Sequence, residues 1–243
     1  MRIPRIHTGQ PLSPGTTVRL DGPPARRIIQ VLRLRPGARL CLFNGDGRDY
    51  EARLSACAKH EATAEITAAS DTQAAPPVHF VLAQGISKGE RMDYALQKAV
   101  ELGIGGFIPL FTERTVVRLQ GERLERRLEH WRSIAIAACE QSGRRRIPSI
   151  GPARRLEEWI SDSSAGLRLL LHPGAPRTLS DLPAPDGPVH LLIGPEGGLS
   201  DGEAGRAEDR GFTPVRLGPR VLRTETAPIA ALAAMQMLWG DFR

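Results

Sequence analysis

The sequence predicts an α/β protein with two domains, the second built on a mainly parallel β-sheet. Residues 1 to about 70 are rich in strand-length segments, whereas strands and helices alternate regularly after residue 78, which is typical of a parallel sheet. Residues 70–77 between them are polar and end in two prolines, which neither a helix nor a central strand would cross. We therefore place the two domains at residues 1–72 and 78–243.

The N-terminal domain is expected to be a small β-barrel. Its strand-length segments are residues 17–20, 39–43, 50–54 and 61–68. The run Asn44-Gly45-Asp46-Gly47 is a strong hairpin signal between two of them. Residues 24–34 are the one helical candidate, because Ile28, Ile29 and Leu32 fall on one face. A barrel of this kind can carry loops that bind RNA.

The second domain is expected to begin with a strand at residues 78–83 and a well-specified helix. Ser87 and Glu90 have the spacing of a capping box, and Gly103 stands where a glycine ends a helix. The elements that follow are a strand at residues 106–111, a long helix at 123–142 and a strand at 167–171.

Charged residues gather where the long helix ends. Glu140, Gln141 and Ser142 precede Gly143 and the run Arg144-Arg145-Arg146. Cations at a helix C-terminus are favoured by the helix dipole in any protein, which is the plain structural explanation. The alternative is that this segment binds an RNA backbone.

Two glycine-rich loops dominate the C-terminal part of the chain. A strand at residues 189–193 leads into 194–199 and then a short helix that Ser200 opens, and a strand at 215–217 leads into 218–227 and a helix at 228–239. Glycines at 194, 197, 198 and 218 let the backbone approach a ligand closely. Neither loop has the lysine of a phosphate-binding P-loop. A pocket made largely of backbone is therefore expected.

Composition narrows the function classes. The net charge of +6 favours a polyanionic partner, although a solvated basic surface would give the same number. Cys41, Cys57 and Cys139 lack disulfide or metal-ligand spacing, so we expect no metal. The chain shows neither a bilayer-length apolar run nor a secretory signal, so we expect a cytoplasmic protein with no membrane association.

The glycine-loop segments closely resemble the signature of the RsmE family, the 16S ribosomal RNA uridine-N3 methyltransferases of the SPOUT superfamily. The resemblance rests on Leu192–Ser200 and Leu217–Ala227 and extends to Met1–Arg5, Lys88–Met92, Gln97–Gly103, Ile136–Arg144 and Leu171–Pro173. It implies a PUA-like β-barrel RNA-binding domain, then a SPOUT α/β domain with a trefoil knot. It also implies a homodimer that transfers the methyl group of S-adenosylmethionine to N3 of a uridine in 16S rRNA. The substrate is either free 16S rRNA or this RNA within the small ribosomal subunit.

The resemblance also implies the site residues. Those expected to bind the cofactor are Leu171, His172, Pro173, Ile193, Gly194, Pro195, Glu196, Gly197, Gly198, Leu217, Gly218, Leu222, Arg223, Thr224, Glu225, Thr226 and Ala227. Arg223 is the candidate that stabilises negative charge on the base, and the candidates for a base or an orienting carboxylate are Glu196, Glu225 and Glu140. Those expected to bind RNA are Arg2, Arg5, Arg26, Arg33, Lys88, Arg91, Arg144, Arg145 and Arg146.

Two other functions compete with methyl transfer as explanations of this sequence. A non-catalytic RNA-binding protein would keep the basic surface and the barrel but would not need two closely spaced glycine loops. A kinase would need phosphate and metal ligands, which the sequence does not offer. The methyltransferase fits best.

Overall fold

The computed structural model describes residues 3–162 and 165–242. The chain divides into two compact units: unit 1 contains residues up to 75 together with 139–147, and unit 2 contains residues 76–138 and the chain from 148 onward. The break between residues 75 and 76 lies inside the polar segment 70–77. The sequence placed 139–147 in the second domain, whereas the structure groups this segment with unit 1. No helix in the described part of the chain has the length and apolarity needed to span a bilayer.

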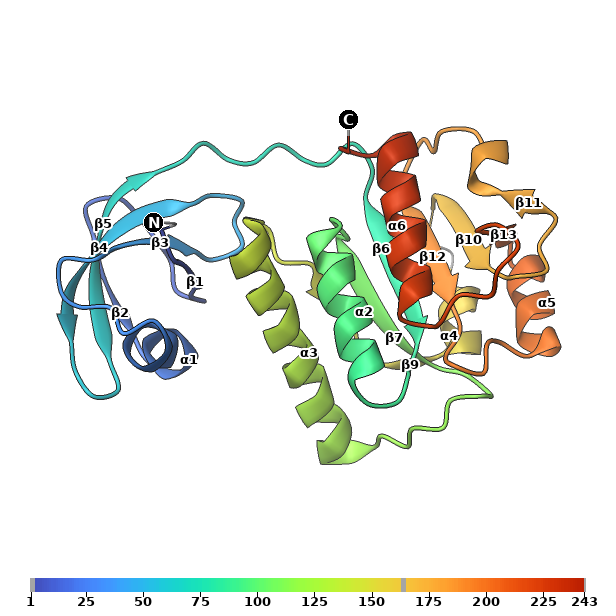
Figure 1. Cartoon of the computed structure of the whole chain (residues 1–243), viewed down its shortest axis with the longest axis horizontal. Helices are drawn as coiled ribbons and strands as arrows, with labels where there is room; N and C mark the ends of the chain where they lie inside the picture. The colour runs from blue at the N-terminus through green and yellow to red at the C-terminus, as the bar shows by residue number, and fades with distance from the viewer. Residues whose placement is uncertain (1–2, 163–164, 243) are drawn as a thin grey trace. The chain divides into compact units, whose positions relative to one another are not determined.

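Unit 1 is built on a five-stranded sheet that curls into a half-barrel (Figure 1). The strand order is β1-β3-β4-β5-β2, and only the β1–β3 pair is parallel. The strands are β1 (Arg5–His7), β2 (Thr17–Leu20), β3 (Arg39–Phe43), β4 (Tyr50–Cys57) and β5 (Ala62–Ala69). The predicted hairpin is confirmed, because β3 and β4 pair antiparallel around residues 44–49. The inward side chains, among them Leu20, Leu42 and Leu54, form one apolar core.

The helical segment of unit 1 differs from the prediction. Residues 24–34 do not form one helix: α1 (Gly22–Arg26) is followed by a π-helical turn, η1 (Arg27–Val31). The wider turn is visible in the hydrogen bond from the Leu32 N–H to the Arg27 carbonyl, five residues back. The helix then stops, because Arg33 adopts a left-handed conformation with φ of +51°. Ile28 is buried as expected, but Leu32 is exposed.

Unit 2 contains the parallel sheet that the sequence predicted. Its strand order is β11-β13-β10-β12-β6-β7-β8, with β9 paired to β7, and every pairing is parallel. The strands are β6 (Phe80–Gly85), β7 (Gly106–Phe111), β8 (Ser149–Ile150), β9 (Arg154–Arg155), β10 (Leu167–Leu171), β11 (Arg177–Thr178), β12 (Val189–Ile193) and β13 (Thr213–Arg216). Buried leucines and valines dominate its central strands, as expected for a sheet covered on both faces.

Helices cover this sheet. The helical elements of unit 2 are α2 (Glu90–Glu101), most of α3 (Gly121–Ser142), α4 (Leu156–Ser161), η2 (Leu179–Asp181), α5 (Asp201–Asp209) and α6 (Thr226–Trp239). The helices α4 and α5 bury Trp159, Ala207 and neighbouring residues against one face of the sheet. The helices α2 and α6 lie side by side in front of the sheet in the view of Figure 1.

The start of α2 corrects a detail of the sequence analysis. Gly89, with φ of +67°, is the N-cap, and the predicted capping box between Ser87 and Glu90 is absent. The Ser87 hydroxyl instead lies 3.2 Å from the Gly85 carbonyl and 3.2 Å from the Thr224 hydroxyl. Gly103 does follow the end of α2 with φ of +91°, as predicted.

Because all pairings in unit 2 are parallel, the carboxyl ends of its strands share one edge of the sheet. The glycine loops follow β12 and β13 at that edge, and the segment after β10 joins them. Ligands of open α/β sheets bind at this edge. The fold therefore brings together three segments that are separated in the sequence.

Candidate active site

Two loops at the carboxyl edge of the sheet enclose a cavity of about 720 Å³. We call residues 194–199, after β12, loop L1, and residues 217–225, between β13 and α6, loop L2. His172 and Pro173, which follow β10, complete one wall. The volume lies within the range of small-molecule sites in proteins. The lining combines backbone of the loops with apolar side chains and a few charged groups.

Close backbone packing explains the glycines of L1. A Cβ on Gly194 would lie 2.7 Å from both the Gly198 carbonyl carbon and the Leu199 nitrogen. A Cβ on Gly85, at the end of β6, would lie 2.5 Å from Pro195. Gly198 adds a left-handed conformation with φ of +69°. L1 therefore folds back on itself and against β6 in a way that no larger residue at these positions allows.

Glu196 is fixed by donors from the start of α2. Its Oε1 accepts hydrogen bonds from the Lys88 backbone N–H at 2.8 Å and from the Arg91 guanidinium at 3.0 Å. Burial alone would raise the pKa of Glu196, but backbone N–H groups and Arg91 outweigh it and hold this pKa below its usual value. Glu196 is therefore an ionised, engaged carboxylate at neutral pH.

Glu225 lies in a different environment. Its Oε2 is buried and has no hydrogen-bond partner within the described residues. The nearest cationic atom is Arg91 Nε at 4.0 Å, which is too far for a hydrogen bond. Glu225 Oε2 thus accepts no hydrogen bond within the described residues, whereas Glu196 Oε1 accepts two.

Arginines surround the cavity in two different states. Arg114, in the loop after β7, donates a hydrogen bond of 2.8 Å to the Gly197 carbonyl and so supports L1. Arg223 of L2 lines the cavity, is exposed, and makes no side-chain hydrogen bond or ion pair within the described structure. Arg220 of L2 shares these properties within the described structure, but the sequence assigned charge stabilisation to Arg223.

Known proteins with this sequence pattern and fold identify the family. The model of an RNA methyltransferase domain matches residues 74–236, and that of an RNA methyltransferase PUA domain matches residues 28–67. The ribosomal RNA small subunit methyltransferase E of Buchnera aphidicola subsp. Schizaphis graminum is 34% identical over 241 residues, covering 99% of this chain and 98% of its own. The chain belongs to the ribosomal RNA small subunit methyltransferase E family.

Solved structures of similar proteins agree in fold and in cofactor. The ribosomal RNA small subunit methyltransferase E from Neisseria gonorrhoeae, bound to S-adenosyl methionine, is 41% identical with a TM-score of 0.92, and all of both chains is covered. A putative methyltransferase from Legionella pneumophila, in complex with the bound cofactor SAM, is 38% identical with a TM-score of 0.97, again over all of both chains. These structures confirm the fold that the resemblance predicted, except for the trefoil knot, which stays a prediction.

In this methyltransferase E family member, nearly all residues that the sequence predicted to bind the cofactor lie together around the cavity. Every predicted cofactor residue except Thr226 lines the cavity; Thr226 is exposed in the first turn of α6. The sequence analysis missed some lining residues, which are Leu170, Arg114, Leu199, Asp201, Arg216, Arg220 and Val221. Arg114 could have been found from its position after a strand of the same parallel sheet.

The residues predicted to bind RNA are in mixed states. Lys88 and Arg91 are exposed beside L1, and Arg26 and Arg33 are exposed in unit 1. Arg2 lies outside the described residues. Arg144 and Arg146 belong to the 139–147 segment of unit 1, where the Arg144 carbonyl accepts a hydrogen bond from Arg5.

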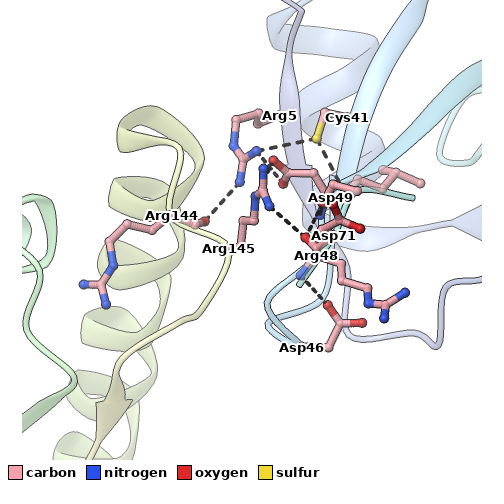
Figure 2. Close-up of polar contacts among 10 residues, drawn as sticks. Arg5, Cys41, Asp46, Arg48, Asp49, Asp71, Arg144 and Arg145 are labelled. Carbon is pink, nitrogen blue, oxygen red and sulfur yellow. Dashed lines mark hydrogen bonds and ion pairs between the residues drawn. The ribbon is translucent and has the colours of Figure 1, made fainter. Parts of the chain in front are cut away.

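Arg5 and Arg145 are engaged inside unit 1. Both guanidiniums bind the carboxylate of Asp49, one at each oxygen, as Figure 2 shows. Arg145 also donates to the Asp71 carbonyl, and the Arg5 side chain is only 11% exposed. These two arginines therefore join the 139–147 segment to the sheet of unit 1.

Glu140 also serves unit 1. Its Oε1 accepts a hydrogen bond from the His7 N–H at 2.9 Å, and its Oε2 pairs with Arg27 at 2.6 Å. Burial raises the pKa of Glu140 against the opposing effect of the His7 N–H and the two nearby arginines. The cavity in unit 2 is lined by Glu196 and Glu225, whereas Glu140 is not among its lining residues.

Proposed function

We propose that this protein is an S-adenosylmethionine-dependent methyltransferase that methylates N3 of a specific uridine in 16S rRNA of the small ribosomal subunit. The observation that carries the proposal is the cavity between L1 and L2, built largely from backbone on the carboxyl edge of the sheet. Relatives over the full chain length are ribosomal RNA small subunit methyltransferases E, and two solved relatives hold the cofactor.

The residues around the cavity fit S-adenosylmethionine. Gly194 and Gly198 form a tight backbone cradle, and Leu171, Ile193 and Leu222 offer apolar contacts for an adenosine. The carboxylates of Glu196 and Glu225 suit a cationic ligand. When bound, the cofactor supplies a methyl group activated by a positively charged sulfur. The protein's own part is then to position the uridine and to manage its N3 proton.

Arg223 and Glu225 are the best candidates for that part. Methyl transfer forms a bond from N3 to the methyl carbon as the carbon–sulfur bond breaks, with its electron pair staying on sulfur, and N3 loses its proton. Negative charge on the uracil oxygens would be stabilised by the unpaired guanidinium of Arg223. Of the carboxylates, Glu225 has the unengaged oxygen and is our proposed base, with Glu196 orienting α2 against L1.

RNA binding is proposed for basic residues of both units. Lys88 and Arg91 are exposed near the mouth of the cavity, and Arg26 and Arg33 are exposed on unit 1, whose sequence matches the PUA domain model. Arg2, Arg5 and the Arg144–Arg146 run stay in the proposal as sequence-based candidates. For Arg5 and Arg145, their pairing with Asp49 favours an indirect role in shaping that surface.

Three further features of the proposal come from the family resemblance. We propose a cytoplasmic homodimer, since the substrate RNA is cytoplasmic and α6 leaves Met237, Leu238 and the following Phe242 exposed. We also propose a trefoil knot in the C-terminal chain. It is supported by the insertion of β12 between β10 and β6 and by the contact of the later loop L2 with Gly194.

The proposal is tested by primer extension on 16S RNA from cells with and without the gene. A methyl group on N3 blocks the base-pairing edge of uridine, so a reverse-transcription stop should vanish in the deletion strain and return with the intact gene. Calorimetry on the purified protein should show S-adenosylmethionine binding. A protein that binds RNA but no cofactor, with the stop unchanged, would favour the non-catalytic alternative.

A further inference from the structure

A buried polar cluster connects L1, L2 and the end of β6. Gln84 is the next-to-last residue of β6, and only 1% of it is exposed. Its Nε2 donates to the Gly194 carbonyl at 3.2 Å and to the Thr224 hydroxyl at 2.9 Å. The Thr224 hydroxyl in turn donates to the same Gly194 carbonyl at 3.0 Å. Three segments that lie far apart in sequence thus meet at one carbonyl oxygen.

We propose that Gln84 and Thr224 form a tether that sets the spacing of L1 and L2 and thereby positions Arg223 and Glu225 for methyl transfer. This inference rests on the function proposed above. Neither Gln84 nor the Thr224 hydroxyl is assigned a chemical step. Both are positioning groups that act through the neighbours of Thr224 in the chain.

The hydrogen atoms in this cluster can be assigned from chemistry. The Gly194 carbonyl only accepts, so the groups that face it must both be donors. The single hydroxyl hydrogen of Thr224 goes to Gly194, so Thr224 can only accept from the Gln84 amide and from the Ser87 hydroxyl, which lies 3.2 Å away. The Gln84 amide must present its NH2 group to both partners, because the reverse orientation would place two oxygens against each other.

The amide oxygen of Gln84 also supports a positioning role for this residue. Its Oε1 is buried and has no hydrogen-bond partner within the described residues. A buried amide oxygen without a partner costs stability. An apolar side chain at this position would avoid that cost but would remove both hydrogen bonds that Gln84 Nε2 donates. What the glutamine adds is a pair of donors directed at the two loops.

The tether matters because L2 is otherwise weakly held. Among described residues, Thr224 is the only member of L2 whose side chain makes a hydrogen bond, and the loop has no helix or strand of its own. Arg223 and Glu225 flank Thr224 directly and both line the cavity. Holding the Thr224 side chain in place therefore also sets the directions in which the Arg223 and Glu225 side chains extend from the backbone.

Four variants test the tether. Q84M keeps the length of the side chain and removes both donors, while T224V keeps the shape and removes the hydroxyl. T224S retains the hydroxyl and should rescue. Q120M is the matched control, since Gln120 is exposed in the segment before α3 and makes no side-chain hydrogen bond within the described structure. Thermal unfolding of each variant checks that the protein remains folded.

The decisive readout is the single-turnover rate of methyl transfer to 16S RNA at saturating S-adenosylmethionine and RNA. A small displacement of reacting groups costs up to about 100-fold in rate, so we expect losses of about tenfold or more for Q84M and T224V. Each single variant leaves the Gly194 carbonyl one donor, so cofactor affinity should stay within about threefold. T224S and Q120M should match the wild type in both measurements.

The double variant Q84M/T224V adds an independent test. It strips both donors from a buried carbonyl of L1, so cofactor affinity by calorimetry should fall in the double variant far more than the two single losses combined. The tether proposal would be wrong if Q84M and T224V transferred methyl groups at the full rate, or if T224S failed to restore the rate. The proposed function would still stand in that case, because the wild-type protein would be active. A folded wild-type protein that transfers no methyl group would overturn both.

Discussion

The carboxylate of Glu196 in L1 accepts a 2.8 Å hydrogen bond from the backbone N–H of Lys88, at the turn that leads into α2. Arg91, the second residue of α2, binds the same oxygen, and its Nε lies 4.0 Å from Glu225 Oε2 in L2. The start of α2 therefore contacts both loops of the cavity. Because the Glu196 carboxylate binds the start of α2, its ionisation should affect the stability of the fold as well as the charge of the cavity.

The first prediction concerns the pH dependence of this contact. Because the folded-state pKa of Glu196 lies below its usual value of 4.5, the ionised carboxylate stabilises the fold above that pH, and the contribution disappears as pH falls through the lowered pKa. The side chain is partly exposed, so the effect should be at most about 1 kcal/mol. The unfolding free energies of wild type and E196Q in urea should differ at neutral pH, and this difference should shrink at an acidic pH well below 4.5. An equal difference at both pH values would contradict it.

The second prediction concerns the cradle of L1. G194A places a methyl group 2.7 Å from backbone atoms of Gly198 and Leu199, so L1 must open, and S-adenosylmethionine affinity should fall by about 100-fold or more. Gly205 in α5 is the matched control, because a Cβ there meets nothing within 4 Å. G205A should bind the cofactor normally and gain about 0.5–1 kcal/mol in unfolding free energy. Calorimetry measures the cofactor affinity of both variants, and urea unfolding measures their unfolding free energy.

Local sequence patterns were sufficient for these loops. Alternating strands and helices predicted the parallel sheet, and glycine with proline in tandem turns predicted a cavity of backbone at its edge. With the family resemblance, most residues of L1 and L2 that line the cavity were found by number, since each loop is one contiguous segment, but Leu199, Arg220 and Val221 were missed. The family resemblance supplied the chemistry that the pattern alone did not contain.

Contacts between distant segments could not be read in this way. Ser87 has the spacing of a helix cap, yet its hydroxyl is directed to Gly85 and Thr224, and a glycine caps the helix instead. Arg114 reaches Gly197 across 83 positions, and Gln84 reaches Thr224 across 140. No helical or strand periodicity encodes such pairings. They depend on the strand order, which the sequence does not state.

The third prediction concerns Arg223. Removing a positioned donor to a developing negative charge typically lowers the rate about 100- to 1,000-fold, so R223A should lose methyl transfer to that extent in a single-turnover assay at saturating cofactor. The guanidinium is exposed and forms no side-chain hydrogen bond within the described structure, so unfolding free energy should change by less than about 0.5 kcal/mol. Full activity in R223A would remove the arginine from the mechanism.

The fourth prediction separates the two carboxylates of the cavity. Glu225 has an unengaged buried oxygen, whereas Glu196 is held by two donors. E225Q should therefore lower the single-turnover rate at saturating cofactor by about 100-fold or more, as expected for loss of a general base. E196Q should act mainly on cofactor affinity and leave that rate within about threefold of wild type. The reverse pattern would assign the base to Glu196.

The fifth prediction concerns Asp49 in unit 1. Its two carboxylate oxygens bind Arg5 and Arg145, so one side chain holds the 139–147 segment against the sheet (Figure 2). D49N leaves two guanidiniums facing each other without a counter-charge, and because the group is partly buried we expect a loss of about 2–3 kcal/mol in unfolding free energy.

Asp71 provides the control for this change. Arg145 contacts only the Asp71 backbone carbonyl, so D71N keeps that bond and should alter unfolding free energy by less than about 0.5 kcal/mol. Urea unfolding of the full-length protein, followed by a probe in each unit, measures both variants. Because the Arg5–Asp49–Arg145 cluster lies within unit 1, D49N should lower the midpoint of that unit while S-adenosylmethionine affinity in unit 2 stays unchanged. If D49N and D71N were equally stable, the cluster would be a surface ion pair with no structural role.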